Sequence, residues 1–220
     1  MAVTRERINQ GMSYELAREM MARNKPNIER IEGLISLTDA DLAPWRNLAE
    51  PYEVLVLVID PCPDVYTNVP ILQRIATESG KLNLHIFMRD DNKDLMAQFM
   101  NGPFESMPVF AFFDKAMSLR SVFIERPKNV TDMRAQKTRE IIEANPDFGP
   151  VGRSPTDMPE EVRVRYQAAI NAMRTASTDF YLGESHREFR EIAEELGRGP
   201  VGDVKWRGNL MGDAVVTATP

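Results

Sequence analysis

Residues 54–72 read VLVLVIDPCPDVYTNVPIL and decide the fold. The first six residues of this stretch, 54–59, are β-branched or leucine. Such a run predicts a strand that is buried on both faces of a parallel or mixed sheet. A helical pattern starts at Pro63, where a missing N–H costs nothing, and Pro70 predicts a kink within it. The only cysteine of the chain, Cys62, therefore lies where a strand passes into a helix.

This position bears on the charge of the thiol. The first turn of a helix has unpaired N–H groups and a partial positive charge, which favour a thiolate. Asp60 and Asp64 flank Cys62, and their negative charges raise the pKa of a thiol. The sequence leaves open which effect prevails.

Composition excludes several classes of function. The chain has 220 residues, 43% of them hydrophobic, and a net charge of −6, which argues against nucleic acid as a partner. No apolar run is long enough for a membrane helix, and the first 23 residues are too charged for a signal peptide, so we expect a cytoplasmic protein. One cysteine excludes an internal disulfide, and with His85 and His186 as the only histidines we expect neither a metal site nor a cofactor.

The order of elements predicts an α/β fold in which a mixed sheet is flanked by helices. Strands are expected at 54–59, 82–88, 109–113 and 119–125, and the last two should form a hairpin. Helices are expected between the first three strands and at 131–144 after the fourth. Strands that alternate with helices imply right-handed crossovers and a layered sheet.

Helical extensions are expected on both sides of this sheet. We place an N-terminal extension at 1–52, the α/β domain at 53–148 and a C-terminal helical extension with a tail at 149–220. Ser185 and Glu188 have the spacing of a capping box, which predicts the start of a helix there. The low-pattern tail from Gly199 to Pro220 is expected to be an arm that wraps the domain or a partner subunit, and the extensions could supply a homodimer interface.

Residues 53–127 resemble a thioredoxin fold, and in particular the bacterial thioredoxin-like proteins that carry a W-C-G-D type motif. Cys62 follows the first core strand, and Pro70 stands eight residues further on, where thioredoxins have a helix-kinking proline. Met107-Pro108 precedes the third strand, where the family has its cis-proline. Asp64 matches the aspartate of the W-C-G-D variant. Arg126-Pro127 also fits a recurrent element of these relatives.

The departures from the family pattern concern the redox motif. Val65 stands where ordinary thioredoxins have the second cysteine, and prolines 61 and 63 replace the tryptophan and glycine that surround the nucleophile. A dithiol cycle, in which a second thiol attacks the mixed disulfide, therefore cannot run within this chain.

The resemblance implies monothiol chemistry. Cys62 would attack a protein or small-thiol disulfide, or a sulfenic acid, and an external thiol such as glutathione would resolve the mixed disulfide. Met107 and Pro108 would bind an extended substrate backbone as an added strand. Asp64 is a candidate general acid or base towards Cys62, with helix-end stabilisation as the alternative. Asp60 is a candidate proton carrier if it is buried, and a solvated carboxylate otherwise.

Two other functions stay open. The domain could be a redox-inactive binding or scaffold module, since a lone cysteine is often a small buried hydrophobe. A peroxidase-type thiol ranks last, because it would need Thr67 and Arg126 to approach Cys62 and polarise a peroxide. His85, in the middle of a predicted strand, is expected to be a half-buried structural residue.

Overall fold

The computed structural model describes residues 3–199 and 203–211. The chain forms two compact units. The first unit consists of Met1–Pro127 and Ser185–Pro220, and the second is Lys128–Glu184. The domain boundaries expected after residues 52 and 148 separate helical extensions from the α/β region, which is a different division from these two units. They stay a prediction.

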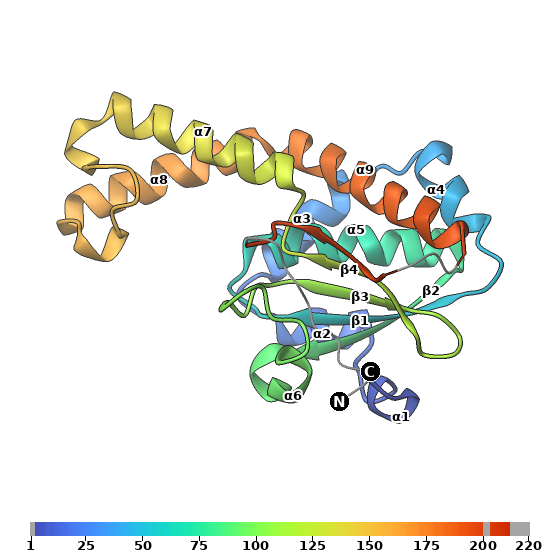
Figure 1. The fold of residues 1–220 in the computed structure, drawn as a ribbon. Coiled ribbons are helices and arrows are strands. Elements are labelled where there is room, and N and C mark those ends of the chain that lie inside the picture. Colours follow the sequence, from blue (N-terminus) through green and yellow to red (C-terminus); the bar gives the residue numbers. More distant parts are fainter. Residues whose placement is uncertain (1–2, 200–202, 212–220) are drawn as a thin grey trace. The chain divides into compact units, whose positions relative to one another are not determined.

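A mixed sheet with the strand order β2-β1-β3-β4-β5 forms the centre of the first unit (Figure 1). β1 is parallel to β2 and antiparallel to β3, β3 and β4 form an antiparallel pair, and β5 is parallel to β4. The predicted α/β fold with a mixed sheet is thus confirmed, and the fifth strand is an addition to it. The strands are β1 (Tyr52–Val58), β2 (Leu82–Met88), β3 (Val109–Phe113), β4 (Leu119–Ile124) and β5 (Lys205–Gly208).

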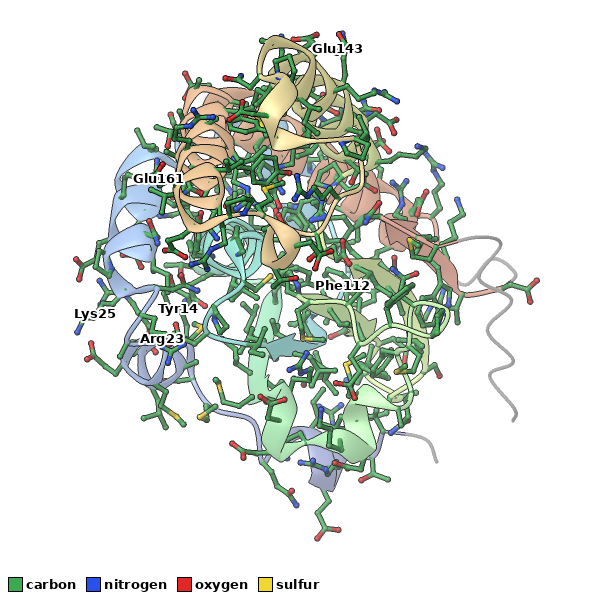
Figure 2. The ribbon with its side chains drawn as sticks, turned by 90° about the vertical axis from the view of Figure 1, so that its left-hand side faces the viewer. Tyr14, Arg23, Lys25, Phe112, Glu143 and Glu161 are labelled. Atoms are coloured by element: carbon green, nitrogen blue, oxygen red, sulfur yellow. The ribbon has the colours of Figure 1, made fainter. Side chains whose placement is uncertain are left out.

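One face of the sheet has an aromatic core. Phe110 on β3 and Phe123 on β4 stack at 5.8 Å, and Phe189 meets both rings edge-on at 5.7 and 5.4 Å. Beside them, Trp45 stacks on Phe112 at 6.1 Å, and Figure 2 shows Phe112 in the interior of this unit. All five rings are fully buried. The helices on this face are therefore attached to the sheet through aromatic contacts.

The opposite face is covered by shorter segments. Phe99, after α6 (Lys93–Met96), packs against Trp206 on β5 at 6.3 Å. At the edge of the sheet, Met12 forms an antiparallel bridge with Ile86 on β2. Gly11 lies so close to β2 that an added Cβ would come within 2.7 Å of the Cβ of His85. The N-terminal segment thus closes the edge that β2 would otherwise expose.

The N-terminal prefix is helical, as predicted. Thr4, Ser13 and Thr38 each accept a hydrogen bond from a backbone N–H of the helix that follows, which explains where three of its helices begin. α3 packs on α5 (Pro63–Ser79), and α4 does the same. The four helices are α1 (Arg5–Ile8), α2 (Tyr14–Met20), α3 (Lys25–Leu34) and α4 (Asp39–Arg46).

The predicted capping box at Ser185 and Glu188 is wrong. Both residues lie inside α9 (Thr178–Gly197), a helix of 20 residues that begins in the second unit and continues into the first. The Ser185 hydroxyl donates to the Asn68 side chain at 2.7 Å, and Glu188 pairs with Arg207 on β5. Long-range partners therefore explain these two polar residues, and a local helix start does not.

The C-terminal arm forms β5, which the sequence pattern does not reveal. Lys205 and Arg207 point towards α9, where they pair with Glu195 at 2.9 and 2.8 Å. Trp206 points to the other face of the sheet, as the alternation of a strand requires. Of the arm predicted from residue 199 onwards, residues 200–202 and 212–220 lie outside the described residues.

The second unit is mainly helical. It contains α7 (Lys128–Ala144), α8 (Glu160–Ala176) and the first turns of α9, with two short 3-10 helices between α7 and α8. Phe148 is its buried centre, with Tyr166 edge-on at 5.5 Å and the Arg165 guanidinium over the ring. The predicted helix at 131–144 is confirmed, with a start at Lys128.

Candidate functional site

Cys62 lies at the N-cap of α5, after the short connection that follows β1. Its backbone is extended, with φ −95° and ψ 120°, and Pro63 begins the helix. The Cys62 side chain does not cap the helix; its thiol donates instead to the Met107 carbonyl oxygen at 3.4 Å. The residue is half-buried. Its sulfur is thus oriented towards the segment that leads into β3.

Met107 and Pro108 reach this position because β1 and β3 are neighbours. Leu57 pairs with Val109, so the end of β1 and the start of β3 lie side by side. The Met107–Pro108 peptide bond is cis, and both residues are buried. The structure therefore brings Cys62, Met107 and Pro108 together at one corner of the sheet, which we call the thiol corner.

Asp64 lies in the first turn of α5, and its side chain is only 6% exposed. The carboxylate forms an ion pair with Arg126, which follows β4. Arg126 reaches it because Ile124 at the end of β4 pairs with Val109 at the start of β3. The same guanidinium also contacts the Glu125 carboxylate at 3.0 Å. Arg126 is thus shared by two carboxylates, of which Asp64 acts on the thiol.

Burial and the neighbouring charges together favour the protonated form of the Cys62 thiol. Burial raises the pKa of Cys62, and the negative charge of Asp64 raises it further. Backbone N–H groups of the first helical turn and the Arg126 guanidinium act in the opposite direction, but they do not compensate. At neutral pH Cys62 is therefore a thiol, consistent with its donating a hydrogen bond to Met107.

Asp60 lies between β1 and Cys62. Its two carboxylate oxygens accept hydrogen bonds from the backbone N–H groups of Arg23 and Asn24, both at 3.0 Å. Figure 2 labels Arg23, Tyr14 and Lys25, which all belong to the helical prefix. The carboxylate thus attaches the prefix to the thiol corner, while its role as a proton carrier stays a prediction.

His85 is half-buried, as expected, and belongs to a separate ion-pair group. Its Nε2 lies 2.7 Å from the Glu53 carboxylate, which also pairs with Arg5. Burial acts to raise the pKa of Glu53, but the hydrogen bonds from His85 and Arg5 outweigh it and lower the pKa overall. These contacts connect β1, β2 and α1 and give His85 a structural explanation.

A buried polar group that the sequence pattern did not predict lies behind the thiol corner. Asn68 is fully buried, and its amide donates to the Glu125 carbonyl at 2.7 Å. Glu125 has a positive φ of 62°, and its N–H donates to the Pro108 carbonyl at 2.8 Å. One signal was available: Asn68 stands four residues after Asp64, on the same face of the same helix.

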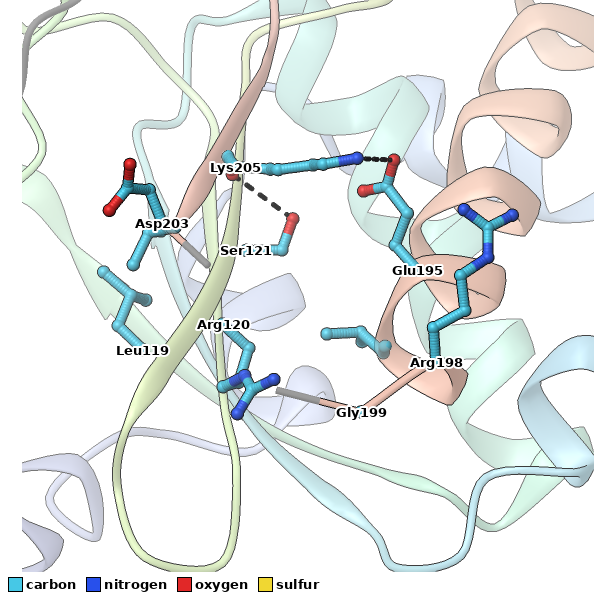
Figure 3. Close-up of a pocket in the computed structure, with 10 residues that line it drawn as sticks. Leu119, Arg120, Ser121, Glu195, Arg198, Gly199, Asp203 and Lys205 are labelled. Atoms are coloured by element: carbon cyan, nitrogen blue, oxygen red, sulfur yellow. Dashed lines mark hydrogen bonds and ion pairs between the residues drawn. The ribbon is translucent and has the colours of Figure 1, made fainter. Parts of the chain in front are cut away.

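The structure also has a small surface hollow at the beginning of β4. It lies at the opposite end of that strand from the thiol corner. It measures about 150 Å³ and is bordered by β4, the end of α9 and β5 (Figure 3). Figure 3 shows the Lys205 ammonium against the Glu195 carboxylate, at 2.9 Å. Both charges are thus already paired within the chain.

The described residues contain neither a candidate metal centre nor a candidate membrane span. Across residues 3–199 and 203–211, there is no group of three or more His, Cys, Asp or Glu side chains that could hold a metal ion. Among the helices in the same ranges, none is long and apolar enough to cross a membrane.

Comparisons with known proteins give one family match. A family model described as "Thioredoxin" matches residues 11–139, more than half of the chain. No curated protein matches. A solved structure of a protein of unknown function from Pseudomonas aeruginosa is similar, with 18% identity over 86% of this chain and 89% of that chain and a TM-score of 0.48. An HIV epitope-scaffold is 16% identical over 85% and 88% of the two chains, with a TM-score of 0.45.

Proposed function

Because the chain belongs to the thioredoxin family, we propose that Cys62 carries out monothiol exchange with disulfides at the thiol corner. The observation that carries the proposal is the position of the half-buried Cys62 sulfur, 3.4 Å from the carbonyl oxygen of Met107. An extended substrate that pairs with the Met107 backbone would bring its own sulfur close to this thiol. Met107 and Pro108 are then binding residues, and Cys62 is the nucleophile.

The exchange needs an external thiol. Cys62 first loses its proton to solvent, and the thiolate attacks one sulfur of a disulfide R–S–S–R′. A bond forms between Cys62 and R–S, and R′–S⁻ leaves and takes up a proton. A second thiol, such as glutathione, then attacks the R–S sulfur, restores the Cys62 thiolate and carries R away as a new disulfide. The cytoplasm, where we place the protein, has a reduced thiol pool for this step.

The raised pKa of Cys62 predicts how this activity depends on pH. The thiolate is the attacking species, so exchange is slow at neutral pH and accelerates as the pH rises above the ordinary thiol value of about 8.5. A thiolate of higher pKa is also the stronger nucleophile, which partly offsets its low population. The proposal is therefore a slow exchange at neutral pH with a steep rise in alkali.

The same raised pKa favours a second candidate, a redox-inactive binding module. In that case the thiol corner would bind an extended segment without covalent chemistry. Val65 in place of a second cysteine is compatible with both functions.

Mass spectrometry after incubation with glutathione disulfide at a series of pH values tests the proposal. Since Cys62 is the only cysteine, one adduct of glutathione mass is expected, and Cys62→Ser is the blank. Its formation should accelerate with pH. Absence of an adduct at every pH at which the protein is folded would leave the binding module as the function.

Asp64→Asn separates the two roles of that carboxylate. If Asp64 acts through its negative charge, the variant lowers the pKa of Cys62 and exchanges faster at neutral pH. If Asp64 is a general base, the variant exchanges more slowly at the same fraction of thiolate.

A further inference from the structure

Residues 203–211, the C-terminal arm, end beside the thiol corner. After β5, the Asn209 N–H donates to the Ile124 carbonyl at 3.1 Å and continues the pairing with β4. Gly208 has a φ of 94°, and an added Cβ there would collide with the Ile124 carbonyl, so glycine is required at this close approach. The arm is thus closely fitted to the end of β4.

Asn101 fixes the end of the arm. Its side-chain amide donates to the Asn209 carbonyl at 2.8 Å and accepts from the Met211 N–H at 2.7 Å. Asn101 is fully buried, so these bonds are shielded from competition by water. The position of Asn209 is therefore set by the fold.

Asn209 connects the arm to the charges around Cys62. Its side-chain amide donates to Glu125 Oε2 at 2.7 Å, and the same oxygen lies 3.0 Å from the Arg126 guanidinium. Arg126 in turn pairs with Asp64. A continuous series of polar contacts thus runs from the arm to the carboxylate beside the thiol.

We propose that Asn209 and Glu125 are positioning residues of the thiol corner, which hold Arg126 between two carboxylates and thereby control how strongly its charge acts on Cys62. Glu125 draws part of the guanidinium's positive charge away from Asp64. Asn209 keeps the Glu125 carboxylate in that place instead of in solvent. The arm, which is far from Cys62 in the sequence, is then a regulatory part of the site.

The backbone of Glu125 supports this role. Its N–H is bound to the Pro108 carbonyl and its carbonyl to the Asn68 amide, so the residue is anchored on both sides in a left-handed conformation that a glutamate rarely adopts. The charged groups that act on the thiol are Asp64 and Arg126, with Glu125 bound to the latter. Asp60 is near in sequence, but both its oxygens accept hydrogen bonds from the prefix.

The test measures the ionisation of Cys62 in the full-length chain. Thiolate absorbance in the ultraviolet is followed against pH, with each variant's Cys62→Ser counterpart subtracted. Asn209→Ala changes no formal charge, and we expect it to lower the Cys62 pKa by about half a pH unit, or about threefold more thiolate at neutral pH, because the Glu125 carboxylate is released. Glu125→Gln should lower it by at least as much.

Two comparisons exclude simpler explanations. Asn209→Ala should have no further effect in a Glu125→Gln background, because the contact it breaks acts through that carboxylate. Glu195→Gln also removes a negative charge bound to the arm, but at the opposite end of β4, and should leave the Cys62 pKa unchanged.

An unchanged Cys62 pKa in folded Asn209→Ala would overturn the proposal, as would an equal shift in the Glu125→Gln background. If Asn209→Ala does not fold, Glu125→Gln alone decides. An unchanged Cys62 pKa in that variant would show that the Glu125 carboxylate does not act on the thiol and would overturn the proposal. The inference deepens the proposed function and rests on it for the role of Cys62. Its readout is independent, because thiolate absorbance reports ionisation whether or not Cys62 exchanges with disulfides.

Discussion

Replacing Phe189 by alanine should destabilise the whole sheet unit. Phe189 lies in α9, is fully buried, and contacts the rings of Phe110 and Phe123 edge-on. Transfer of a buried Phe side chain to water costs about 2–3 kcal/mol. A residual cavity of about 50–100 Å³ adds about 1–2.5 kcal/mol at about 24 cal/mol per Å³. We therefore expect Phe189→Ala to lower the free energy of unfolding by about 4 kcal/mol.

Chemical denaturation followed by circular dichroism measures this loss, and thermal unfolding should show a decrease in Tm of about 8–16 °C for a unit of this size. Phe180→Ala is the matched control, because Phe180 lies in the same helix but is 44% exposed, and its loss should be within about 0.5 kcal/mol. A loss below about 1 kcal/mol for Phe189→Ala would contradict the inference that the second part of α9 completes the core of the sheet. A separate early transition that leaves the sheet folded would contradict it as well.

Three further predictions concern the N-terminal prefix. Asp60→Ala removes the acceptor of two backbone N–H groups and should cost about 1–3 kcal/mol in urea unfolding, whereas a loss within error would show that this attachment of the prefix contributes nothing. The lowered pKa of Glu53 means that its ion pairs with His85 and Arg5 stabilise the fold above the unfolded value of about 4.3 and lose this effect as the pH falls below it. Glu53→Gln should therefore flatten the fall in stability between about pH 5 and pH 3, and an unchanged pH profile would refute this account. Gly11→Ala should destabilise the protein by about 1–3 kcal/mol, because the added Cβ would meet His85, and an unchanged melting temperature would show that the edge segment can move away.

The central strands and α5 were predictable because their signals are local. The run at 54–59 and the short apolar run at 109–113 have the composition of buried strands, and Pro63 and Gly80 mark the ends of a helix at positions where each residue fits the backbone. The resemblance to thioredoxins led us to expect Cys62 beside Pro108, and the antiparallel pairing of β1 with β3 explains how the structure brings these two residues together. This part of the site could therefore be placed from the resemblance, whereas the sequence pattern alone does not give the strand order.

The rest depends on contacts between residues far apart in the sequence. β5 has only four residues, KWRG, and no alternation that separates it from a loop; its pairing with β4 and its ion pairs with α9 define it. Ser185 and Glu188 match a local capping pattern, but in the structure Ser185 donates to Asn68 and Glu188 pairs with Arg207. A local rule fails wherever a hydrogen bond or ion pair to a distant, buried partner stabilises a polar side chain more than the local cap would.

The charge of Cys62 shows the same limit at the candidate site. In the sequence, the helix end lowers the pKa of Cys62 and two acidic neighbours raise it. The directions of these effects alone could not decide whether the pKa is lowered or raised overall. The fold binds the Asp60 carboxylate to the prefix, keeps Asp64 next to the thiol, and adds Arg126, which Glu125 shares. Burial of the sulfur then determines the direction, because it penalises the thiolate whatever the neighbouring charges are. The ionisation of this lone cysteine is thus a property of the assembled corner, and substitutions in the C-terminal arm should change it as effectively as substitutions beside it in the sequence.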